Sequence, residues 1–459
     1  MKYFFEPNGI AVIGASSQKG KIGNEVLRSL ISSGYKKLYP INPKEEEILG
    51  IKCYKRIEEI DNQVDLAVIV LASEKVLDAI KGCGKKGVKG IVIISAGFKE
   101  VGLLEYEKNI VETAKGYGMR IIGPNCIGIF DGKSGMNTFF QPNEMMRRPK
   151  YGNIAFLTQS GTYGCTLLEW LADEGIGVSK FVSYGNKCDV DEIDMLNYLE
   201  KDKETKVISL YLEGINDGRK FMKILKEVTV SKPVVLLKAG KTNEGARAAA
   251  SHTGAIAINE IVFSSAMRQC GAIEVEEMEE MLDVLKIIST QKLPFGGKIG
   301  MVTNGVGPCV VAIDFLRETS SLKLGVISEE GIKELKNKLP SYCIFENPID
   351  LTGSATAEMY ATSIKLLEKE KNIDIIMPFY VFQDAPLGYT VDELHNFLKS
   401  FKTNKTIVCV AGGSDFSRSN ANKMQSYNIP VIPTAKRAML ALDKIVKYCK
   451  WRDRYKNQC

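Results

Sequence analysis

The 459-residue sequence contains very little histidine and tryptophan, with two residues of each. It has no apolar run close to the roughly 20 residues that a membrane-spanning helix needs, so no membrane association is expected. Its 11 cysteines show no Cys-x-x-Cys spacing. The sequence therefore indicates neither a zinc ribbon nor a disulfide framework, and no metal site is predicted. Because the first residues, MKYFFEPNGIAVIG, also lack signal-peptide architecture, we expect a cytoplasmic protein with reduced thiols.

The charge of the chain is mild and shows no concentration of one sign. The net charge is +6, with 61 basic and 55 acidic residues spread along the sequence. The basic segment KYCKWRDRYK near the C-terminus is interpreted as the solvated end of a helix, and no nucleic-acid partner is predicted. The overall composition, 45% hydrophobic and 25% charged, is ordinary for a globular protein. The length of the chain favours about three domains.

Short apolar segments such as GIAVIG, DLAVIVL and GIVIISAG alternate with amphipathic helical segments. This alternation predicts an α/β fold of parallel sheets with crossover helices. The pattern restarts at YGNIAFLTQSGTYGCTLLEWL and again at FGGKIGMVTNGVGPCVVAIDFL. Both restarts combine Gly-x-Ile, a strand, a Thr-containing turn with glycine and an apolar helix, which indicates an internal repeat. We predict domains at residues 1–130, 150–290 and 296–459.

The segment IAVIGASSQKGKIGNEVL reads as a strand, a small-residue turn and a helix, a typical site for a phosphate group. The turn departs from the dinucleotide fingerprint, and the second strand ends in NPK rather than in the acidic residue that NAD needs. Lys44 in that tripeptide suits coenzyme A (CoA), whose ribose carries a 3′-phosphate, although NADP and a dehydrogenase stay open. The predicted residues of this site are Gly14, Ala15, Ser16, Ser17 and Lys44.

One of the two histidines, His252, lies in the small-residue segment SHTGA. Its small neighbours leave room for a tetrahedral phosphate that carries roughly −1.5 to −2 charges. A neutral imidazole becomes a competent nucleophile when its other nitrogen is held by an acceptor. A buried structural histidine is the alternative. The second histidine, His395 in VDELHNFLK, is expected to lie on a helix surface.

Eight segments form a further pattern along the chain: GASSQKGKIG, ISAGF, IGPNCIGI, LTQSGTYG, YLEGI, SHTGAIA, MVTNGVGP and NPIDLTGSAT. In this order they resemble the nucleoside-diphosphate-forming acyl-CoA synthetases of the succinyl-CoA ligase superfamily, above all the α subunits of the ADP-forming acyl-CoA (acetyl-CoA) synthetases. The resemblance implies a Rossmann-like CoA-binding domain followed by two flavodoxin-like domains. It also implies the reaction acyl-CoA + phosphate + ADP ⇌ carboxylate + CoA + ATP, through an acyl phosphate and a phosphohistidine.

The same resemblance implies roles for individual residues. His252 matches the phosphorylated histidine, and Glu213 matches the glutamate that orients its imidazole. Two helix N-termini are expected to face the phosphoryl group, formed by Ser160, Gly161 and Thr162 and by Asn304, Gly305, Val306 and Gly307. Coenzyme A is expected to continue from the first turn past Ser95, Ala96 and Gly97, with its thioester near Asn125 and Cys126.

Two departures from succinyl-CoA ligase limit the resemblance. That enzyme has SGTLTYE, whereas SGTYGCT here places Cys165 where the tyrosine would stand, which favours a monocarboxylate over succinate. A glycine-rich ATP-grasp segment is also missing, so ADP/ATP and Mg²⁺ are expected on a separate ATP-grasp β subunit, in an α2β2 assembly. A CoA- or nucleotide-sensing regulatory module without turnover is the alternative function, and a dehydrogenase ranks third.

Overall fold

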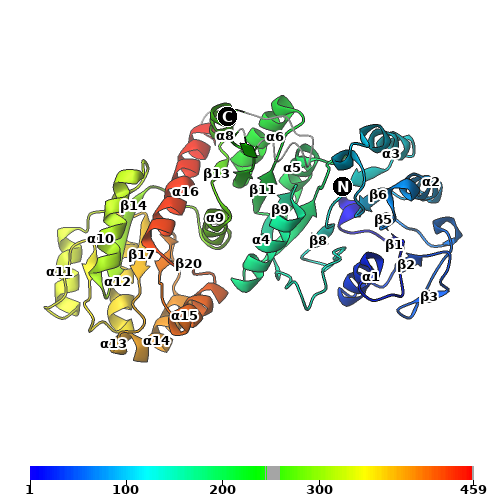
Figure 1. The fold of residues 1–459 in the computed structure, drawn as a ribbon. Helices are drawn as coiled ribbons and strands as arrows, with labels where there is room; N and C mark the ends of the chain where they lie inside the picture. The colour runs from blue at the N-terminus through cyan, green and yellow to red at the C-terminus, as the bar shows by residue number, and fades with distance from the viewer. Residues whose placement is uncertain (243, 246–258, 457–459) are drawn as a thin grey trace. The chain divides into compact units, whose positions relative to one another are not determined.

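The computed structural model describes residues 1–242, 244–245 and 259–456, so His252 lies outside the described residues. The chain divides into two compact units, Met1–Glu276 and Glu277–Cys459 (Figure 1). Among the described residues, the first unit contains two large sheets and a two-stranded hairpin, and the second contains one sheet. The three-domain boundaries inferred from the sequence stay a prediction. No helix in the described part of the chain is long and apolar enough to cross a membrane.

The first sheet is parallel and has the strand order β2-β1-β5-β6-β7. Its strands are β1 (Ile10–Ile13), β2 (Leu38–Ile41), β5 (Leu66–Ile69), β6 (Gly90–Ile93) and β7 (Arg120–Ile122). Its helices are α1 (Ile22–Ser32), α2 (Val76–Lys86) and α3 (Leu104–Gly116), and the hairpin β3 (Glu47–Ile48) and β4 (Ile51–Lys52) follows β2. This order is that of a doubly wound fold, whose ligands bind beyond the carboxyl ends of the strands where the order reverses.

Alternate side chains of β1 enter different apolar clusters because successive side chains of a strand point to opposite faces. Val12 belongs to the cluster that contains Leu30 of α1, whereas Ala11 belongs to the cluster that contains Ile80 of α2. The cluster around Val12 continues into the second sheet and includes Leu157. The two sheets of the first unit therefore share one hydrophobic core.

The second sheet has the order β13-β12-β11-β9-β10-β8 and is parallel except for β8. Its strands are β8 (Ile129–Asp131), β9 (Tyr151–Thr158), β10 (Val178–Ser183), β11 (Val207–Leu212), β12 (Val234–Lys238) and β13 (Ile273–Val275). Its described helices of eight residues or more are α4 (Gly161–Asp173), α5 (Glu192–Lys201), α6 (Gly218–Ser231) and α8 (Glu260–Gln269). The five parallel strands have the flavodoxin-like order.

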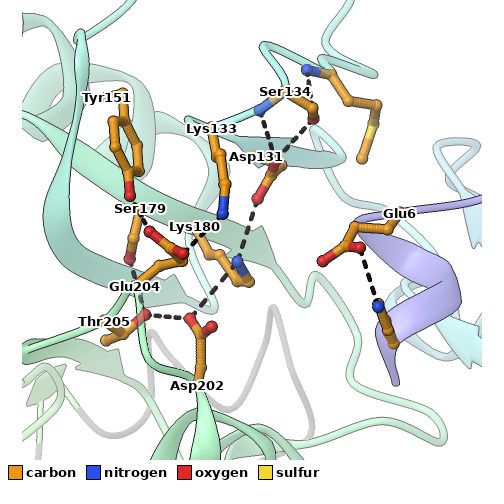
Figure 2. Close-up of polar contacts among 12 residues, drawn as sticks. Glu6, Asp131, Lys133, Ser134, Tyr151, Ser179, Lys180, Asp202, Glu204 and Thr205 are labelled. Atoms are coloured by element: carbon orange, nitrogen blue, oxygen red, sulfur yellow. Dashed lines mark hydrogen bonds and ion pairs between the residues drawn. The ribbon is translucent and has the colours of Figure 1, made fainter.

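The antiparallel strand β8 is tied to β10 by a buried ion-pair network near the amino-terminal ends of the parallel strands (Figure 2). Nζ of Lys180, a buried residue of β10, lies 3.1 Å from Asp131 Oδ1 and 3.5 Å from Asp202 Oδ2. Ser134 donates from Oγ to Asp131 Oδ2 at 2.6 Å. The two carboxylates compensate the charge of the buried lysine, as burial of a charge requires.

The second unit repeats the flavodoxin-like order, with the path β15-β14-β17-β19-β20 and parallel pairing. Its strands are β14 (Lys298–Thr303), β15 (Lys323–Leu324), β16 (Ile349–Asp350), β17 (Ile375–Phe379), β18 (Thr406–Ile407), β19 (Cys409–Val410) and β20 (Val431–Ile432). Its helices are α9 (Met278–Thr290), α10 (Val306–Asp314), α11 (Glu329–Lys338), α12 (Ala357–Lys369), α13 (Ala385–Tyr389), α14 (Val391–Ser400), α15 (Asp415–Ser426) and α16 (Ala435–Lys456).

Helix α9 joins this unit because Arg437 of α16 binds Asp283 of α9 with two bonds, at 2.7 and 2.9 Å. The basic C-terminal segment forms the last turns of α16, and its Tyr448 and Cys449 are buried. Five short 3-10 helices complete the described elements: η1 (Lys2–Phe4), η2 (Ile57–Glu59), η3 (Ser73–Lys75), η4 (Lys99–Val101) and η5 (Phe315–Glu318). The prediction of parallel α/β sheets with crossover helices is confirmed.

The expectation that His395 lies on a helix surface is wrong. Its side chain is buried in α14 on the same face as Leu394 and Leu398. Nε2 lies 2.9 Å from Asn420 Oδ1, which can only accept, so Nε2 donates and Nδ1 accepts from the hydroxyl of Tyr427. The apolar spacing i, i+3 and i+4 around this histidine predicts its buried face, and the polar neighbours in VDELHN obscure it.

Burial lowers the pKa of His395, although the hydrogen bond with Asn420 opposes the shift. The folded state therefore disfavours the imidazolium, while an unfolded chain takes up a proton below about pH 6.5. The free energy of unfolding should fall as the pH drops through that range. We expect His395→Gln to show a smaller loss of melting temperature between pH 7.5 and 5.5 than the parent protein, in thermal denaturation. Equal losses in the two proteins would contradict a neutral buried imidazole.

Candidate functional site

A cavity of about 820 Å³ lies at the carboxyl ends of β1, β2 and β5, where the order of the first sheet reverses. Four of the residues predicted from the first turn and second strand line it: Gly14, Ala15, Ser16 and Lys44. This is the position at which doubly wound sheets bind nucleotides. The cavity volume falls within the usual range of about 300–1,000 Å³ for small-molecule sites.

Glycine is required where α1 begins against the end of β1. Gly14 has φ +91°, and a Cβ there would lie 2.2 Å from the carbonyl oxygen of Val70. A Cβ on Gly23 would lie 2.0 Å from the carbonyl oxygen of Gly14. The N-cap residue of α1, Lys21, makes no side-chain cap bond. The start of this 11-residue helix therefore presents main-chain donors and the positive end of its dipole to the cavity.

Basic side chains predominate around this cavity. The lining residues include the cations Lys21, Lys44, Lys55, Arg56 and Lys75, against the carboxylates of Glu58 and Asp78. Arg56 forms an ion pair with Glu58 at 3.4 Å. Within the described ranges, the four lysines form no ion pair at 4.0 Å or less. This balance favours an anionic ligand that carries more than one phosphate.

The other residues predicted for this ligand lie at different distances from the cavity. Ser17 is exposed, does not line it and donates to Glu45 Oε1 at 2.7 Å. Ser95, which begins the segment Ser95 to Gly97 after β6, accepts from the main-chain nitrogen of Leu71, a lining residue, at 3.1 Å. Gly97 has φ +100°, so a side chain there would be strained. The segment 95–97 therefore continues from the edge of the cavity.

Asn125 and Cys126 lie in the turn after β7. Asn125 is exposed, with φ +58°, and its main-chain nitrogen donates to Ser95 O at 2.9 Å. Cys126 is buried, its Sγ donates to Ile93 O at 3.2 Å, and burial raises the pKa of its thiol to about 12. Any contact of this turn with a ligand therefore comes from Asn125 and the main chain rather than from a cysteine thiolate.

Glu213 directly follows β11, and four hydrogen bonds fix the main chain of Glu213 and Gly214. Gln159 Oε1 accepts from the nitrogens of Glu213 and Gly214 at 2.6 and 3.0 Å. Lys238 Nζ donates to Glu213 O, and Lys187 Nζ donates to Gly214 O, each at 2.8 Å. Burial lowers the pKa of Lys238, and the Glu213 carboxylate opposes that shift. The turn thus holds the carboxylate-bearing residue rigidly at the carboxyl edge of the sheet.

Helix α4 begins one strand away from this turn. Its N-cap is Ser160, whose Oγ accepts from the nitrogen of Tyr163 at 3.3 Å. Thr158 Oγ1 accepts from the nitrogen of Ser160 at 3.1 Å and donates to the carbonyl oxygen of the same residue at 2.8 Å. The predicted residues Gly161 and Thr162 are therefore the first two of the 13-residue helix, where free N–H groups favour an anion.

The second unit repeats this arrangement. Thr303 Oγ1 accepts from the nitrogen of Gly305 at 3.0 Å and donates to its carbonyl oxygen at 2.8 Å. Asn304 Oδ1 accepts from the nitrogen of Val381 at 2.9 Å, as Gln159 accepts from that of Glu213. Helix α10 follows with Val306 and Gly307 as its first residues. The repeat inferred from the sequence is therefore present in the hydrogen bonds of both turns.

The sequence alone misses several residues of these sites. Gln159, Lys187 and Lys238 hold the Glu213 turn, and Arg56 lines the cavity, yet none of them is a predicted site residue, and only Gln159 lies in one of the eight segments that carry the resemblance. Gln159 is the exception for which a signal exists, because it occupies the same place in LTQSG as Asn304 in VTNGV. Among the described residues, no group of three or more His, Cys, Asp or Glu could hold a metal ion.

Two family models match the first unit and its continuation into α9. The CoA binding domain matches residues 8–131, and the succinyl-CoA ligase like flavodoxin domain matches residues 151–288. The chain is 44% identical over 383 residues to the acetate–CoA ligase [ADP-forming] II subunit alpha of Pyrococcus furiosus, with 83% of this chain and 82% of that protein covered. The corresponding I subunit alpha is 36% identical and is covered completely, as is this chain.

The chain belongs to the family of the ADP-forming acetate–CoA ligases.

A solved structure of the dinucleotide forming acetyl-coenzyme A synthetase 1 from Ca. Korarchaeum cryptofilum, in complex with phosphate and ADP, has the same fold. The TM-score is 0.93 at 36% identity, with 100% of this chain and 98% of that chain covered. The chain spans 64% of the acetate–CoA ligase [ADP-forming] I of Archaeoglobus fulgidus, to which it is 39% identical. These relatives are acid–thiol ligases, so a catalytic role is supported over the regulatory alternative, and the dehydrogenase has no support.

The first cavity generates a prediction about the 3′-phosphate of CoA. Lys44→Met should weaken CoA binding by about 1 kcal/mol, roughly five-fold, because one charge-assisted contact is lost. Isothermal titration calorimetry should show no such loss for dephospho-CoA, which lacks that phosphate. Lys36→Met, an exposed lysine outside the cavity lining, is the matched control and should bind both ligands normally. Equal weakening of both ligands by Lys44→Met would contradict the assignment.

Proposed function

We propose that this chain is an α-type subunit that converts acetyl-CoA, or another monocarboxylic acyl-CoA, into carboxylate and CoA and collects a phosphoryl group on His252. CoA occupies the cavity at the end of β1, with its phosphates near Ser16 and Lys44 and its pantetheine passing the segment 95–97. The single observation that carries the proposal is the rigid turn at Glu213 beside the start of α4. It holds the main chain of a glutamate next to an anion-binding helix end, where its carboxylate would serve as the hydrogen-bond acceptor.

The proposed reaction proceeds in two transfers on this chain. A phosphate oxygen attacks the thioester carbonyl carbon, the carbon–sulfur bond breaks and CoA leaves as its thiolate. An imidazole nitrogen of His252 then attacks phosphorus, the bond from phosphorus to the acyl oxygen breaks and the carboxylate leaves. Each transfer can be aligned and stabilised separately. The N-terminus of α4 supplies main-chain donors for the phosphoryl oxygens, contributing about 0.3–1 kcal/mol at an exposed site.

The third transfer, from phosphohistidine to ADP, is assigned to a partner subunit of ATP-grasp type that carries ADP/ATP and Mg²⁺, in an α2β2 assembly. The names of the Pyrococcus furiosus relatives as alpha subunits support a partner. The greater length of two ligases whose names carry no subunit designation supports the same division of labour, because this chain spans 64% of one and 63% of the other. A monocarboxylate is favoured because Cys165 stands where succinyl-CoA ligase has a tyrosine.

Glu213→Gln tests the role of the carboxylate. The substitution keeps the shape but removes the charged acceptor that orients the imidazole and stabilises its cation. Loss of one charge-assisted hydrogen bond, roughly 1.5–3 kcal/mol, should slow phosphorylation of His252 about 10- to 150-fold without changing CoA affinity. Rapid-quench measurement of phosphoenzyme from acetyl-CoA and radiolabelled phosphate gives the rate. His252→Ala supplies the unlabelled blank, and a normal rate in Glu213→Gln would sink the proposed role.

The two-subunit division gives a second prediction. The purified full chain should become phosphorylated from acetyl-CoA and phosphate but should form no ATP when ADP and Mg²⁺ are added. The reason is that the nucleotide site is assigned to the partner. A coupled luciferase assay detects ATP, and acid-labile radiolabel on the protein shows that the preparation is active. Multiple turnovers of ATP synthesis by the single pure chain would rule out this division.

A further inference from the structure

Two turns face each other at the carboxyl edges of the two sheets of the first unit. The turn at residues 123–128 follows β7, and the turn at residues 184–188 follows β10. The main-chain nitrogen of Asn186 donates to Pro124 O at 2.8 Å. An ideal Cβ on Gly185 would lie 2.2 Å from Asn125 O, so only glycine permits this approach. The two turns are therefore in main-chain contact.

Strained residues occur in both of these turns. Asn125 has φ +58° in the first, and Lys187 has φ +57° in the second. The left-handed region is disfavoured for residues with a side chain, and such conformations gather at functional sites, where surrounding contacts hold them in place. Besides main-chain bonds, these turns are held by the side chains of Asn186 and Lys187.

The buried amide of Asn186 connects the turn at Asn125 with the loop that follows β6. Its Nδ2 donates to Glu107 Oε2 at 2.8 Å and also to Glu100 Oε2. Its Oδ1 accepts a long bond of 3.4 Å from Asn125 Nδ2. Glu100 Oε1 in turn accepts from the nitrogen of Gly97 at 2.5 Å. Asn186 therefore joins the loop of Gly97 to the turn at Asn125, in addition to the direct bond from Asn125 N to Ser95 O.

The neighbouring side chain, Lys187, reaches the other part of the site. Its Nζ lies 2.9 Å from Glu192 Oε2 and donates to Gly214 O at 2.8 Å. The side chains of this ion pair are 3% and 0% exposed, so the bond to Gly214 is shielded from solvent. Gly214 directly follows Glu213. Consecutive residues of one turn thus hold the loops on the CoA side and the turn that carries Glu213.

We propose that Asn186 and Lys187 are positioning residues that fix the thioester-side loops and the Glu213 turn in one frame, so that the acyl phosphate forms where His252 can use it. This inference rests on the function proposed above. Asn186 acts on the first transfer through Asn125 and the segment 95–97. Lys187 acts on phosphorylation of the histidine through Glu213. Loss of the Asn186 contacts should therefore impair the route that starts from the thioester, whereas loss of the Lys187 contact should impair phosphorylation of the histidine from any donor.

The test compares two labelled donors on the full chain without nucleotide: acetyl-CoA with radiolabelled phosphate, and radiolabelled acetyl phosphate, which bypasses the thioester. Asn186→Ala should slow labelling from acetyl-CoA about 10- to 100-fold, the effect of losing bonds to charged groups. Labelling from acetyl phosphate should stay within about two-fold of the parent rate. The substitution should act on the rate at saturating acetyl-CoA more than on its apparent KM.

The second arm removes the contact of Lys187. Lys187→Met combined with Glu192→Met avoids leaving either charge buried and unpaired. This double variant should slow labelling from both donors by similar factors, because Glu213 serves both. Asn197→Ala is the matched control, since this exposed asparagine of α5 makes one local bond, to Ile193 O at 2.8 Å. It should behave as the parent protein with either donor.

A conservative exchange distinguishes the positioning role of Asn186 from an effect of simple misfolding. Asn186→Asp places a third carboxylate beside Glu100 and Glu107 and should reproduce the defect with acetyl-CoA. Adding Glu100→Gln reverses donor and acceptor across that contact and should restore part of the lost rate. If Asn186→Ala slowed labelling from both donors equally, or slowed labelling from neither donor, the positioning role would be overturned. Absence of labelling in the parent protein with both donors would instead refute the proposed function.

Discussion

Hydrogen bonds to the main-chain N–H and C=O groups of the loops beyond the strand ends determine the geometry of the site. Strands that end in loops leave N–H and C=O groups that must find partners when they are buried. At the end of β9 and of β14, an amide side chain takes this role for the loop of the neighbouring strand. Gln159 and Asn304 therefore determine where the next loop begins. Lysines then bind the remaining carbonyl oxygens in the first unit.

The CoA-binding region follows the same logic with glycine in place of amides. Gly14 and Gly23 allow the start of α1 to touch the end of β1, so main-chain donors of the helix reach the cavity. The lysines that line it then add positive charge without needing exact placement. The main chain sets precise positions, and the lysine side chains supply long-range attraction. Residues that the sequence predicts to bind the phosphates of the ligand therefore share one cavity with Arg56, which the sequence does not predict.

The sequence predicts the sheets and their repetition well because apolar runs and glycine turns are local signals. It also places Gly14, Ser160 and Asn304 at strand-to-helix turns, since each follows an apolar strand within two residues. It cannot find Asn186 or Lys238, because their partners are separated from them by 25 to 86 residues and only the fold joins them. His395 shows the opposite failure, in which a local helical spacing was available but its polar neighbours concealed it.

In both flavodoxin-like sheets an amide side chain, Gln159 or Asn304, binds the loop of the neighbouring strand, but the residue bound in that loop differs. The strand pairing aligns Tyr211 with Thr158 and Phe379 with Thr303, so Val381 occupies the place of Glu213. One copy of the repeat presents an acid at this edge and the other presents a hydrocarbon. The chain thus carries two copies of one flavodoxin-like fold that are not interchangeable, because the carboxylate at this edge belongs to the copy in the first unit.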